Sequence, residues 1–384
     1  MNVFKPDMGE EEIRAVAEVI RSGWIGLGPK TAEFERKFAD YLGVAHTVAL
    51  NSCTAALDLA LKLLEIKNGD EVIVPTMTFV STAHTVAYNL AYPIFVDVDK
   101  QTKNLDLSDV VRKLSRRTKA IIPVHFAGRP VDLDALKGIA PGVPIIEDAA
   151  HACGARYKGK RVGSFGNIAC YSFHAVKNLA MGDGGALTTD NNEFNERAKR
   201  LRWLGIDKGT WDRTAVDQSY WWEYYVNEIG LKCHLNDIAA AIGLVQLAKL
   251  DKMNERRRQI KNIYNEGLRD LEQVTLPPDD DGDYQSSWHI YSICSDHRDE
   301  LSVFLQTNGI STGVHYKPIH LYKCYGNITH LPTAEWLFSR LLTLPMYPGL
   351  SDADAWRVVE CIRDFHKNYG TRLDERNSRV RGED

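Results

Sequence analysis

The sequence lacks several features that would place it in a specialised class of protein. No apolar run approaches the roughly 20 residues that a membrane-spanning helix needs, so we expect no membrane span. The N-terminal stretch MNVFKPDMGEEEIRAV has no apolar segment behind a positively charged start, and we therefore predict no secretory signal peptide. The formal net charge of −4 provides no positive field for holding nucleic acid nonspecifically. The basic triplet Arg256-Arg257-Arg258 is expected on the solvent-exposed face of a helix.

Cysteine is scattered rather than grouped. The seven cysteines are odd in number, lie far apart and include no Cys-x-x-Cys pair, which predicts neither a disulfide framework nor a zinc site. We therefore expect a protein of the reducing cytoplasm that binds no metal. The seven positions are Cys53, Cys153, Cys170, Cys233, Cys294, Cys324 and Cys361.

The residues that are present suit a large globular protein. A chain of 384 residues is long enough for two packed domains. Hydrophobic residues make up 44% and charged residues 26%, so the chain can bury an ordinary core under a polar surface. Wholesale disorder is therefore not expected.

An amphipathic helix is predicted at residues 10–22, because apolar side chains recur there at helical spacing. Gly23 follows and can cap the end of this helix. The residues that share its apolar face are Ile13, Val16, Ala17 and Ile20.

Four short runs rich in β-branched residues follow the first helix. Continuously apolar runs of this kind are typical of strands buried on both faces of a mainly parallel sheet. Their spacing of roughly 20–25 residues leaves room for a crossover helix in each gap. The pattern predicts an α/β fold, with a mainly parallel sheet flanked by helices. The runs are Glu71–Val74, Pro93–Val98, Lys119–His125 and Val143–Glu147.

The C-terminal third has a different pattern. An Ala- and Leu-rich helix is predicted at Asn236–Leu250, followed by a charged helix that runs to about Leu268. The stretch PPDDDGD is a loop by composition, and shorter strand and helix signals come after it. We therefore expect a large α/β domain at 1–249, a smaller α+β domain at 250–370 and a charged tail at 371–384.

Asp148 directly follows the predicted strand that ends at Glu147. In an open α/β sheet, ligands bind beyond the carboxyl ends of the strands, where this carboxylate is expected. Asp148 followed by two alanines would equally suit the N-cap of a helix. The spacing leaves both readings open.

Lys177 stands in the stretch SFHAVKNL, among small and apolar residues. Such a lysine either extends its amine to solvent or has a specific partner. The stretch GDGG that follows at 182–185 lets the backbone approach a ligand closely, but it also suits a plain tight turn.

Two further segments could bind a ligand at the same edge of the sheet. Ser52 or Thr54 could cap the helix that begins near Cys53, or the helix N-terminus could hold a phosphate group. Phe79 follows another predicted strand and could be core, or could stack on a planar ligand. A lysine, a carboxylate, an aromatic ring and a phosphate cradle at one edge are what pyridoxal phosphate requires.

The sequence resembles the DegT/DnrJ/EryC1/StrS family of sugar aminotransferases, which are fold-type-I pyridoxal-phosphate enzymes. The resemblance covers nearly the whole chain, and its motifs are specific in combination. The matching stretches are SGWIGLGPKTAEFERKFADYLG, GDEVIVPTMTFVSTAHTV, PIFVDVD, IIPVHFAGRPVDLDAL, IIEDAAHACGARYKGKRVGSFG, SFHAVKNLAMGDGG, LNDIAAAIGLVQL, HYKPIH and LPMYP.

The resemblance implies roles around the cofactor ring. Lys177 would form the Schiff base with pyridoxal 5′-phosphate, and Asp148 would pair with the protonated pyridine nitrogen. Phe79 would stack on one face of the ring, and His151 would lie near the phenolic oxygen. Many members of the family have glutamine at the position of His151. To move a proton near pH 7, the freed amine of Lys177 must have a pKa below the ~10.4 of free lysine, and burial shifts the pKa in that direction.

The resemblance also implies a phosphate site shared between two subunits of a homodimer. The amides of Cys53 and Thr54 and the hydroxyl of Ser172 would bind the phosphate. In a common family stretch, Gly-Tyr-Asn-Tyr-Arg-Met, the asparagine reaches the phosphate of the neighbouring subunit. The corresponding stretch here is GLKCHL, so Lys232 is the candidate. The alternative for Lys232 is an ordinary surface side chain. The family's Gly-Glu-Gly-Gly is Gly-Asp-Gly-Gly in this chain, a change without an evident meaning.

By this resemblance, the chain is an aminotransferase that moves an amino group from an amino acid, L-glutamate, to a nucleotide-linked keto sugar in polysaccharide biosynthesis. Sugar dehydratases of the same family have histidine in place of the Schiff-base lysine, and Lys177 argues against that alternative. A non-catalytic regulatory homologue would not need both Lys177 and Asp148. The aromatic-rich segment Trp211–Tyr225 is predicted to line either the sugar site or a subunit interface.

Overall fold

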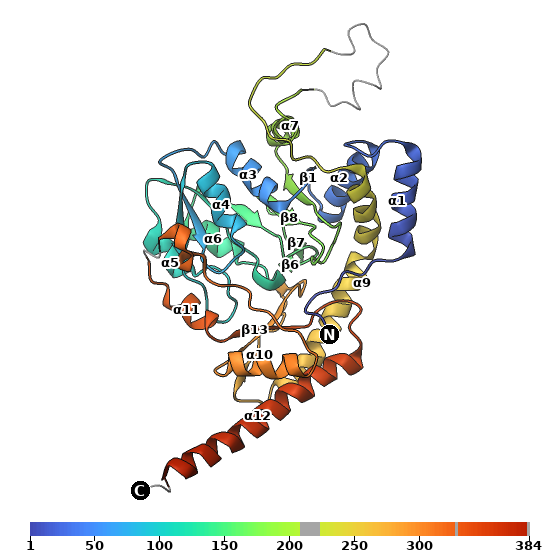
Figure 1. The fold of residues 1–384 in the computed structure, drawn as a ribbon. Helices are drawn as coiled ribbons and strands as arrows, with labels where there is room; N and C mark the ends of the chain where they lie inside the picture. Colours follow the sequence, from blue (N-terminus) through green and yellow to red (C-terminus); the bar gives the residue numbers. More distant parts are fainter. Residues whose placement is uncertain (208–222, 327–328, 382–384) are drawn as a thin grey trace.

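A twisted sheet lies at the centre of the larger part of the molecule (Figure 1). The computed structural model describes residues 1–207, 223–326 and 329–381. Two hydrogen-bonded groups of strands are joined by parallel bridges between Ile121 and Ile145 and between Val124 and Asp148. Strand β9 is antiparallel to both of its neighbours, and the other pairings are parallel. In spatial order the strands are β3 (Tyr92–Val96), β2 (Glu71–Pro75), β4 (Thr118–Ile121), β5 (Ile146–Asp148), β8 (Ile168–Ser172), β9 (Gly185–Thr189) and β1 (His46–Leu50).

Helices cover both faces of this sheet. Because successive residues of a strand point to opposite faces, Val48 packs with one set of helices and Ala49 with another. One face is covered by α3 (Cys53–Leu63), α4 (Ser81–Tyr88) and α7 (Asn192–Leu201), and the other by α2 (Pro29–Leu42), α5 (Leu107–Lys113), α6 (Leu133–Ile139) and α9 (Asp237–Leu268). The prediction of a mainly parallel sheet flanked by helices is confirmed, and the four predicted strands are β2 to β5.

The C-terminal part forms a second, smaller layer around its own core (Figure 1). An antiparallel sheet in the order β10-β12-β13 packs against helices and against the end of α9. A second small sheet, in the order β11-β6-β7, joins residues from both parts of the chain. The remaining elements are α1 (Glu10–Ser22), η1 (Phe126–Gly128), β6 (Arg156–Tyr157), β7 (Lys160–Arg161), β10 (Val274–Thr275), β11 (Tyr284–Gln285), β12 (Tyr291–Ser295), α10 (Arg298–Thr307), η2 (Ile319–Leu321), η3 (Lys323–Tyr325), α11 (Pro332–Phe338), β13 (Leu341–Leu344) and α12 (Asp352–Arg381).

Helix α9 is continuous, although the sequence suggested an apolar helix followed by a separate charged one. It crosses residue 249, so the expected domain boundary falls inside a helix and stays a prediction. Helix α12 includes residues 371–381 of the expected tail.

On α9, Arg257 is buried beside Ile260, and its Nη1 donates to the carbonyl of Met346 at 2.8 Å. The prediction that the basic triplet faces solvent is wrong for Arg257, because this face of α9 packs against the C-terminal core.

Helix α1 is present where the sequence predicts it, but its apolar face points outward. Ile13 and Ile20 are 61% and 59% exposed, whereas Val19 and Glu12 are buried against α9. The carboxylate of Glu12 accepts a hydrogen bond from Nζ of Lys249 at 2.8 Å, so its burial is compensated by an opposite charge. Of the predicted apolar face, Ile13 and Ile20 are therefore exposed, whereas Val16 and Ala17 are half-buried.

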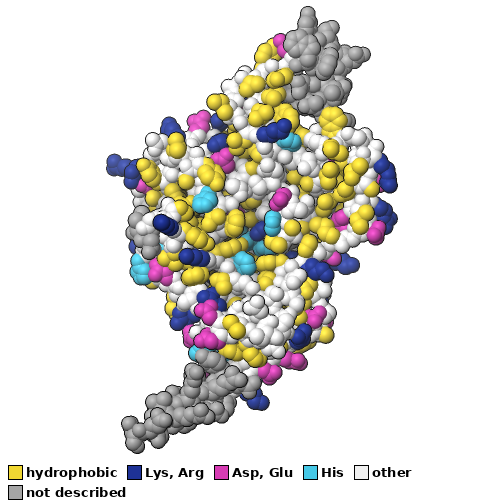
Figure 2. Space-filling model, viewed as in Figure 1, with side chains coloured by type: hydrophobic (Ala, Val, Ile, Leu, Met, Phe, Trp, Pro, Cys, Tyr) yellow, Lys and Arg dark blue, Asp and Glu magenta, His cyan; other side chains and the backbone are white. Residues whose placement is uncertain are grey.

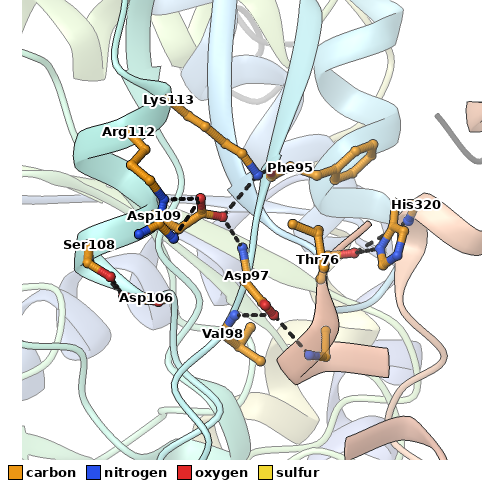
Figure 3. Close-up of polar contacts among 12 residues, drawn as sticks. Thr76, Phe95, Asp97, Val98, Asp106, Ser108, Asp109, Arg112, Lys113 and His320 are labelled. Atoms are coloured by element: carbon orange, nitrogen blue, oxygen red, sulfur yellow. Dashed lines mark hydrogen bonds and ion pairs between the residues drawn. The ribbon is translucent and has the colours of Figure 1, made fainter. Parts of the chain in front are cut away.

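Two polar contacts attach the C-terminal part to the ends of the central strands (Figure 3). The carboxylate of Asp97, just beyond β3, accepts the N–H groups of Thr333 at 2.9 Å and Ala334 at 2.8 Å and so caps α11. The hydroxyl of Thr76, just beyond β2, lies 2.6 Å from Nδ1 of His320. These contacts fix the segment before His320 over the carboxyl edge of the sheet. Among the described residues, no helix has the length and the apolar composition needed to cross a membrane.

Candidate active site

A cavity of about 370 Å³ opens at the carboxyl ends of β2, β5 and β8. This is the edge at which open α/β sheets bind ligands. Seven of the eight residues that the sequence singles out line this cavity, and Lys232 does not. The seven are Cys53, Thr54, Phe79, Asp148, His151, Ser172 and Lys177.

The N-terminus of α3 faces the cavity. Ser52 is its N-cap, because the Ser52 hydroxyl accepts the N–H of Ala55 at 3.1 Å. The first-turn N–H groups of Cys53 and Thr54 have no acceptor within the helix and are available to an anion. Gly185 lies directly behind this turn: a β-carbon there would meet the carbonyl carbon of Ser52 at 2.3 Å and the nitrogen of Cys53 at 2.5 Å. The glycine therefore allows β9 to approach the helix start closely.

Asp148 ends β5 and points its carboxylate into the cavity. Its Oδ2 accepts the hydroxyl proton of Thr82 at 2.9 Å, and its Oδ1 accepts the N–H of Ala150 at 3.2 Å. Burial raises the pKa of Asp148, and the hydrogen bond from Thr82 acts in the opposite direction. No helix begins directly after Asp148, since residues 150–151 and 153–154 form turns, so the N-cap alternative does not apply.

Lys177 lies in the turn after β8, and its amine faces the cavity instead of extending into solvent. Its Nζ is 3.4 Å from Nε2 of His289. Removal from water lowers the pKa of Lys177 to about 8, although the nearby Asp148 acts in the opposite direction. A substantial fraction of the amine is therefore neutral near physiological pH, as proton transfer requires.

His151 and Phe79 both line the cavity. Nε2 of His151 lies 3.0 Å from the hydroxyl of Tyr316, while its buried Nδ1 has no hydrogen-bond partner among the described residues. Burial lowers the pKa of His151 well below its usual value, so the ring is neutral. Phe79 is 58% exposed, which removes the alternative that it is a core residue.

Lys232 lies away from this cavity in its own subunit. It is exposed, and its amine lies 5.0 Å from the centroid of the Trp203 ring. Of the aromatic segment Trp211–Tyr225, residues 211–222 fall outside the described residues, and Tyr224 and Tyr225 are exposed.

Four residues near the cavity were not anticipated from the sequence. Thr82 orients Asp148, and His289 contacts Lys177. His315 and Tyr316 close the cavity from the C-terminal part. His315 and Tyr316 belong to the stretch HYKPIH, which is part of the family resemblance in the sequence. This stretch is far from Lys177 along the chain, so its position at the cavity could not be inferred from the sequence. The Thr76–His320 contact brings this stretch to the sheet edge (Figure 3).

The groups around the cavity fit pyridoxal phosphate. The first turn of α3 suits the phosphate, the carboxylate of Asp148 suits a protonated ring nitrogen, and the amine of Lys177 suits the aldehyde. The unpartnered Nδ1 of His151 is a further buried polar atom that a bound ligand could satisfy. No cluster of three or more His, Cys, Asp or Glu side chains suited to a metal ion occurs in the part of the chain that the structure describes.

Known proteins resemble this chain over almost its full length. The sequence model of the DegT/DnrJ/EryC1/StrS aminotransferase family matches residues 6–363. The spore coat polysaccharide biosynthesis protein SpsC of Bacillus subtilis is 40% identical over 377 residues, which cover 94% of this chain and 96% of SpsC.

Solved structures share the fold. The aminotransferase TlmJ from Streptoalloteichus hindustanus superposes with a TM-score of 0.90 at 37% identity, over 96% of this chain and 99% of TlmJ. The sugar aminotransferase Spr1654 from Streptococcus pneumoniae, in its PMP-form, gives 0.90 at 32% identity over 96% of this chain and 99% of Spr1654. Spr1654 has also been solved in an apo-form and a PLP-form, with TM-scores of 0.90 and 0.88.

Proposed function

The chain belongs to the DegT/DnrJ/EryC1/StrS aminotransferase family, and we propose that it moves an amino group from L-glutamate to a keto sugar carried on a nucleotide. Its family and its solved relatives identify it as a pyridoxal-phosphate-dependent sugar aminotransferase. The observation that carries the proposal is the meeting of the Lys177 amine, the Asp148 carboxylate and the N-terminus of α3 at one cavity. The name of SpsC supports a place in polysaccharide biosynthesis.

Asp148 keeps a proton on the ring nitrogen of the cofactor in this proposal. Bound pyridoxal phosphate supplies a reactive aldehyde and a ring that accepts the electrons of a broken C–H bond. A carboxylate beside the ring nitrogen favours the protonated ring, which is the better electron acceptor. Thr82 holds the carboxylate in place through its 2.9 Å hydrogen bond.

Lys177 would hold the cofactor covalently and would also move the substrate proton. The neutral Nζ of Lys177 would take the α-proton of the amino acid and later give it back, while the bound cofactor would accept the electrons of the broken C–H bond. Its pKa of about 8 supports this role, because an amine with an ordinary pKa would stay protonated at neutral pH. The intact lysine also disfavours the alternative of a sugar dehydratase, and the lysine with Asp148 disfavours a non-catalytic regulator.

The remaining residues would bind and orient the cofactor. The amides of Cys53 and Thr54 and the hydroxyl of Ser172 would hold the phosphate, a role supported by the position of the first turn of α3 at the cavity. Phe79 would stack on the ring from the cavity wall. His151 would use its unpartnered Nδ1 on the phenolic oxygen.

We further propose a homodimer in which Lys232 reaches the phosphate of the neighbouring site. Lys232 is exposed and away from its own cavity, and a cation adds the full charge that an amide cradle lacks. Large exposed apolar residues support a subunit interface, and Figure 2 shows hydrophobic side chains gathered over the upper part of one face. Such residues include Ile13, Ile20, Ile25, Leu204 and Ile229.

All seven cysteines are unpaired, which supports a reducing cytoplasm as the location.

Incubation of the purified protein with L-glutamate and a panel of nucleotide-linked keto sugars tests the function. We expect an amino sugar nucleotide and 2-oxoglutarate in equal amounts, and neither with Lys177→Ala. The same keto sugars without the nucleotide are the matched control. Equal turnover of the free sugars would contradict a nucleotide-linked substrate, and glutamate deamination without any aminated sugar would contradict the acceptor class.

Mixing Lys177→Ala subunits with Lys232→Ala subunits tests the shared site, provided that each variant is inactive alone and that exchange is confirmed. With random re-pairing, about half of the dimers are mixed and each has one undamaged site, so roughly a quarter of full activity should return. If no activity returns, Lys232 does not serve the neighbouring site.

A further inference from the structure

The amine of Lys177 has one hydrogen-bond partner among the described residues, the imidazole of His289. Nζ and Nε2 lie 3.4 Å apart. The side chain of His289 is 1% exposed and contacts Lys177, but His289 does not line the cavity. A buried histidine directly against the proposed proton carrier, without contact to the cavity, is suited to act on the lysine rather than on a substrate.

The contacts of Asn178 determine which nitrogen of His289 carries the proton. Nδ2 of Asn178 lies 2.8 Å from the carbonyl oxygen of Ser287, which can only accept, so this atom is the amide nitrogen. It also donates to Oδ1 of Asn254 at 2.7 Å. Oδ1 of Asn178 is therefore an acceptor, and it lies 3.0 Å from Nδ1 of His289. Nδ1 must carry the proton, which leaves the lone pair of Nε2 directed at Lys177.

Two aromatic rings also pack against the imidazole ring. Phe4 stacks on it with ring centroids 5.4 Å apart and an interplanar angle of 10°, and His151 packs against it at 4.6 Å. The backbone N–H of His289 donates to the carbonyl of Ala127 at 3.0 Å, which attaches this segment to the large domain. Rotation of the ring would break the bond to Asn178 and the stacking on Phe4. The acceptor is thus fixed in position.

We propose that His289 is a positioning residue for the reaction, with its proton held on Nδ1 by Asn178 and its Nε2 accepting a hydrogen bond from the amine of Lys177. The inference rests on the proposed role of Lys177 as the cofactor lysine. A hydrogen bond to Nε2 would restrict the rotation of the free Lys177 amine. It also favours the ammonium form, since a lone pair accepts more strongly from N–H⁺ than from N–H.

Other titratable groups around Lys177 affect its charge as well. Asp148 favours the ammonium form, and the thiol of Cys53 lies nearby. His151 and His315 also face the amine, and burial keeps both rings neutral. Burial lowers the pKa of His289 well below its usual value, so its Nε2 stays an acceptor at neutral pH. A change at His289 alone therefore removes an acceptor without removing a charge.

Two substitutions separate the contacts of His289. His289→Asn keeps an N–H at the position of Nδ1, and so keeps the bond to Asn178, but it has no atom that reaches Lys177. His289→Gln has a carbonyl oxygen near the position of Nε2, and so keeps an acceptor for Lys177. Phe4→Leu is the packing control, because it changes the face of the ring without touching either nitrogen.

The measurement is the pH dependence of the reductive methylation of Lys177 by formaldehyde and cyanoborohydride, which supplies the hydride, in the full-length chain freed of cofactor. Peptide mass spectrometry quantifies the methylated lysine. Only the neutral amine reacts, so the midpoint reports its pKa. We expect a midpoint near 8 in the unchanged protein. A hydrogen bond to a charged group is worth roughly one to two pH units, and 3.4 Å is long for such a bond. His289→Asn should therefore lower the midpoint by about half a unit to one unit, whereas His289→Gln and Phe4→Leu should leave it within about 0.3 units.

Turnover gives an independent readout. His289→Asn should lower kcat by about tenfold, with the KM of both substrates unchanged because His289 lies outside the cavity lining, and His289→Gln should recover most of kcat. An unchanged midpoint and an unchanged kcat in His289→Asn would overturn the proposal. So would equal losses in the Asn, Gln and Leu variants, which would indicate packing alone.

A neutron diffraction structure of the unaltered protein covers the case in which the variants do not fold. A deuteron on Nδ1 of His289 and none on Nε2 is the expected result, and the reverse arrangement would overturn the proposal.

The methylation midpoint does not depend on the cofactor. A pyridoxyl adduct on a lysine other than Lys177 would therefore refute the proposed function separately, while the contact between His289 and Lys177 would still be measured.

Discussion

A methyl group added at Gly185 would collide with the backbone that begins α3. The new β-carbon would lie 2.3 Å from the carbonyl carbon of Ser52 and 2.5 Å from the nitrogen of Cys53, whereas ordinary contacts begin at 3.4 Å. Backbone atoms cannot rotate away as a side chain can, so β9 and the helix start must separate by about 1 Å. Overpacking of this kind costs about 1–3 kcal/mol.

Gly185→Ala should therefore weaken binding of pyridoxal phosphate, because the displaced first turn of α3 carries the N–H groups proposed to bind the phosphate. If the whole cost appears in binding, the dissociation constant rises by about fivefold to about 140-fold, since each 1.4 kcal/mol is a factor of ten. Titration of the cofactor-free protein, followed by absorbance or by quenching of tryptophan fluorescence, measures this constant.

Gly184→Ala is the matched control in the neighbouring residue. Its β-carbon would meet side-chain atoms of Met181, Phe173 and Leu235 at 3.2–3.4 Å, and these can shift slightly. We expect its dissociation constant to stay within about threefold of the unchanged protein. A Gly185→Ala protein that binds the cofactor as tightly as Gly184→Ala would refute the idea that this close approach shapes the phosphate cradle.

Three further predictions address the ring nitrogen, the proton carrier and the attachment of the C-terminal part. Asp148→Asn should still bind the cofactor, but its kcat should fall by about a hundredfold or more, because a neutral amide does not favour a protonated ring nitrogen. Near-normal turnover would show that this carboxylate is not needed. The rate at which the cofactor-free protein binds pyridoxal phosphate at Lys177, measured by stopped flow, should rise about tenfold per pH unit up to about pH 8 and then level off. The reason is that a pKa lowered by burial leaves the amine neutral above that value. A rise that continues to pH 10 would contradict the lowered pKa. Asp97→Ala should lower the free energy of unfolding by about 1–2 kcal/mol, because α11 loses the acceptor for two N–H groups. The spectrum of the bound cofactor should stay unchanged. An unaltered denaturant midpoint would disprove this capping.

The sequence was sufficient for four of the seven strands of the central sheet and for one edge of the site. Buried parallel strands are continuously apolar, so β2 to β5 could be recognised without a partner. Because ligands collect at the carboxyl ends of such strands, Asp148 and Phe79 could be assigned to one edge from their order alone. Seven of the eight selected residues do line one cavity there.

Tertiary contacts decided what the sequence left open. Asp148 could have been a helix cap, and only the turn that follows it excludes this. The outward apolar face of α1 depends on the pairing of Glu12 with Lys249, which spacing does not reveal. His289 contacts Lys177 from 112 residues further along the chain, so no local pattern could place it at the site.

Reduction of the cofactor-loaded protein with borohydride, followed by peptide mapping, tests most directly whether Lys177 is the residue that carries the cofactor. Reduction fixes the link between lysine and cofactor as a stable secondary amine, and the modified peptide then identifies the lysine. We predict a single pyridoxyl adduct, on Lys177, and none in Lys177→Ala. An adduct on any other lysine of the unchanged protein would contradict the assignment of Lys177 and the chemistry built on it.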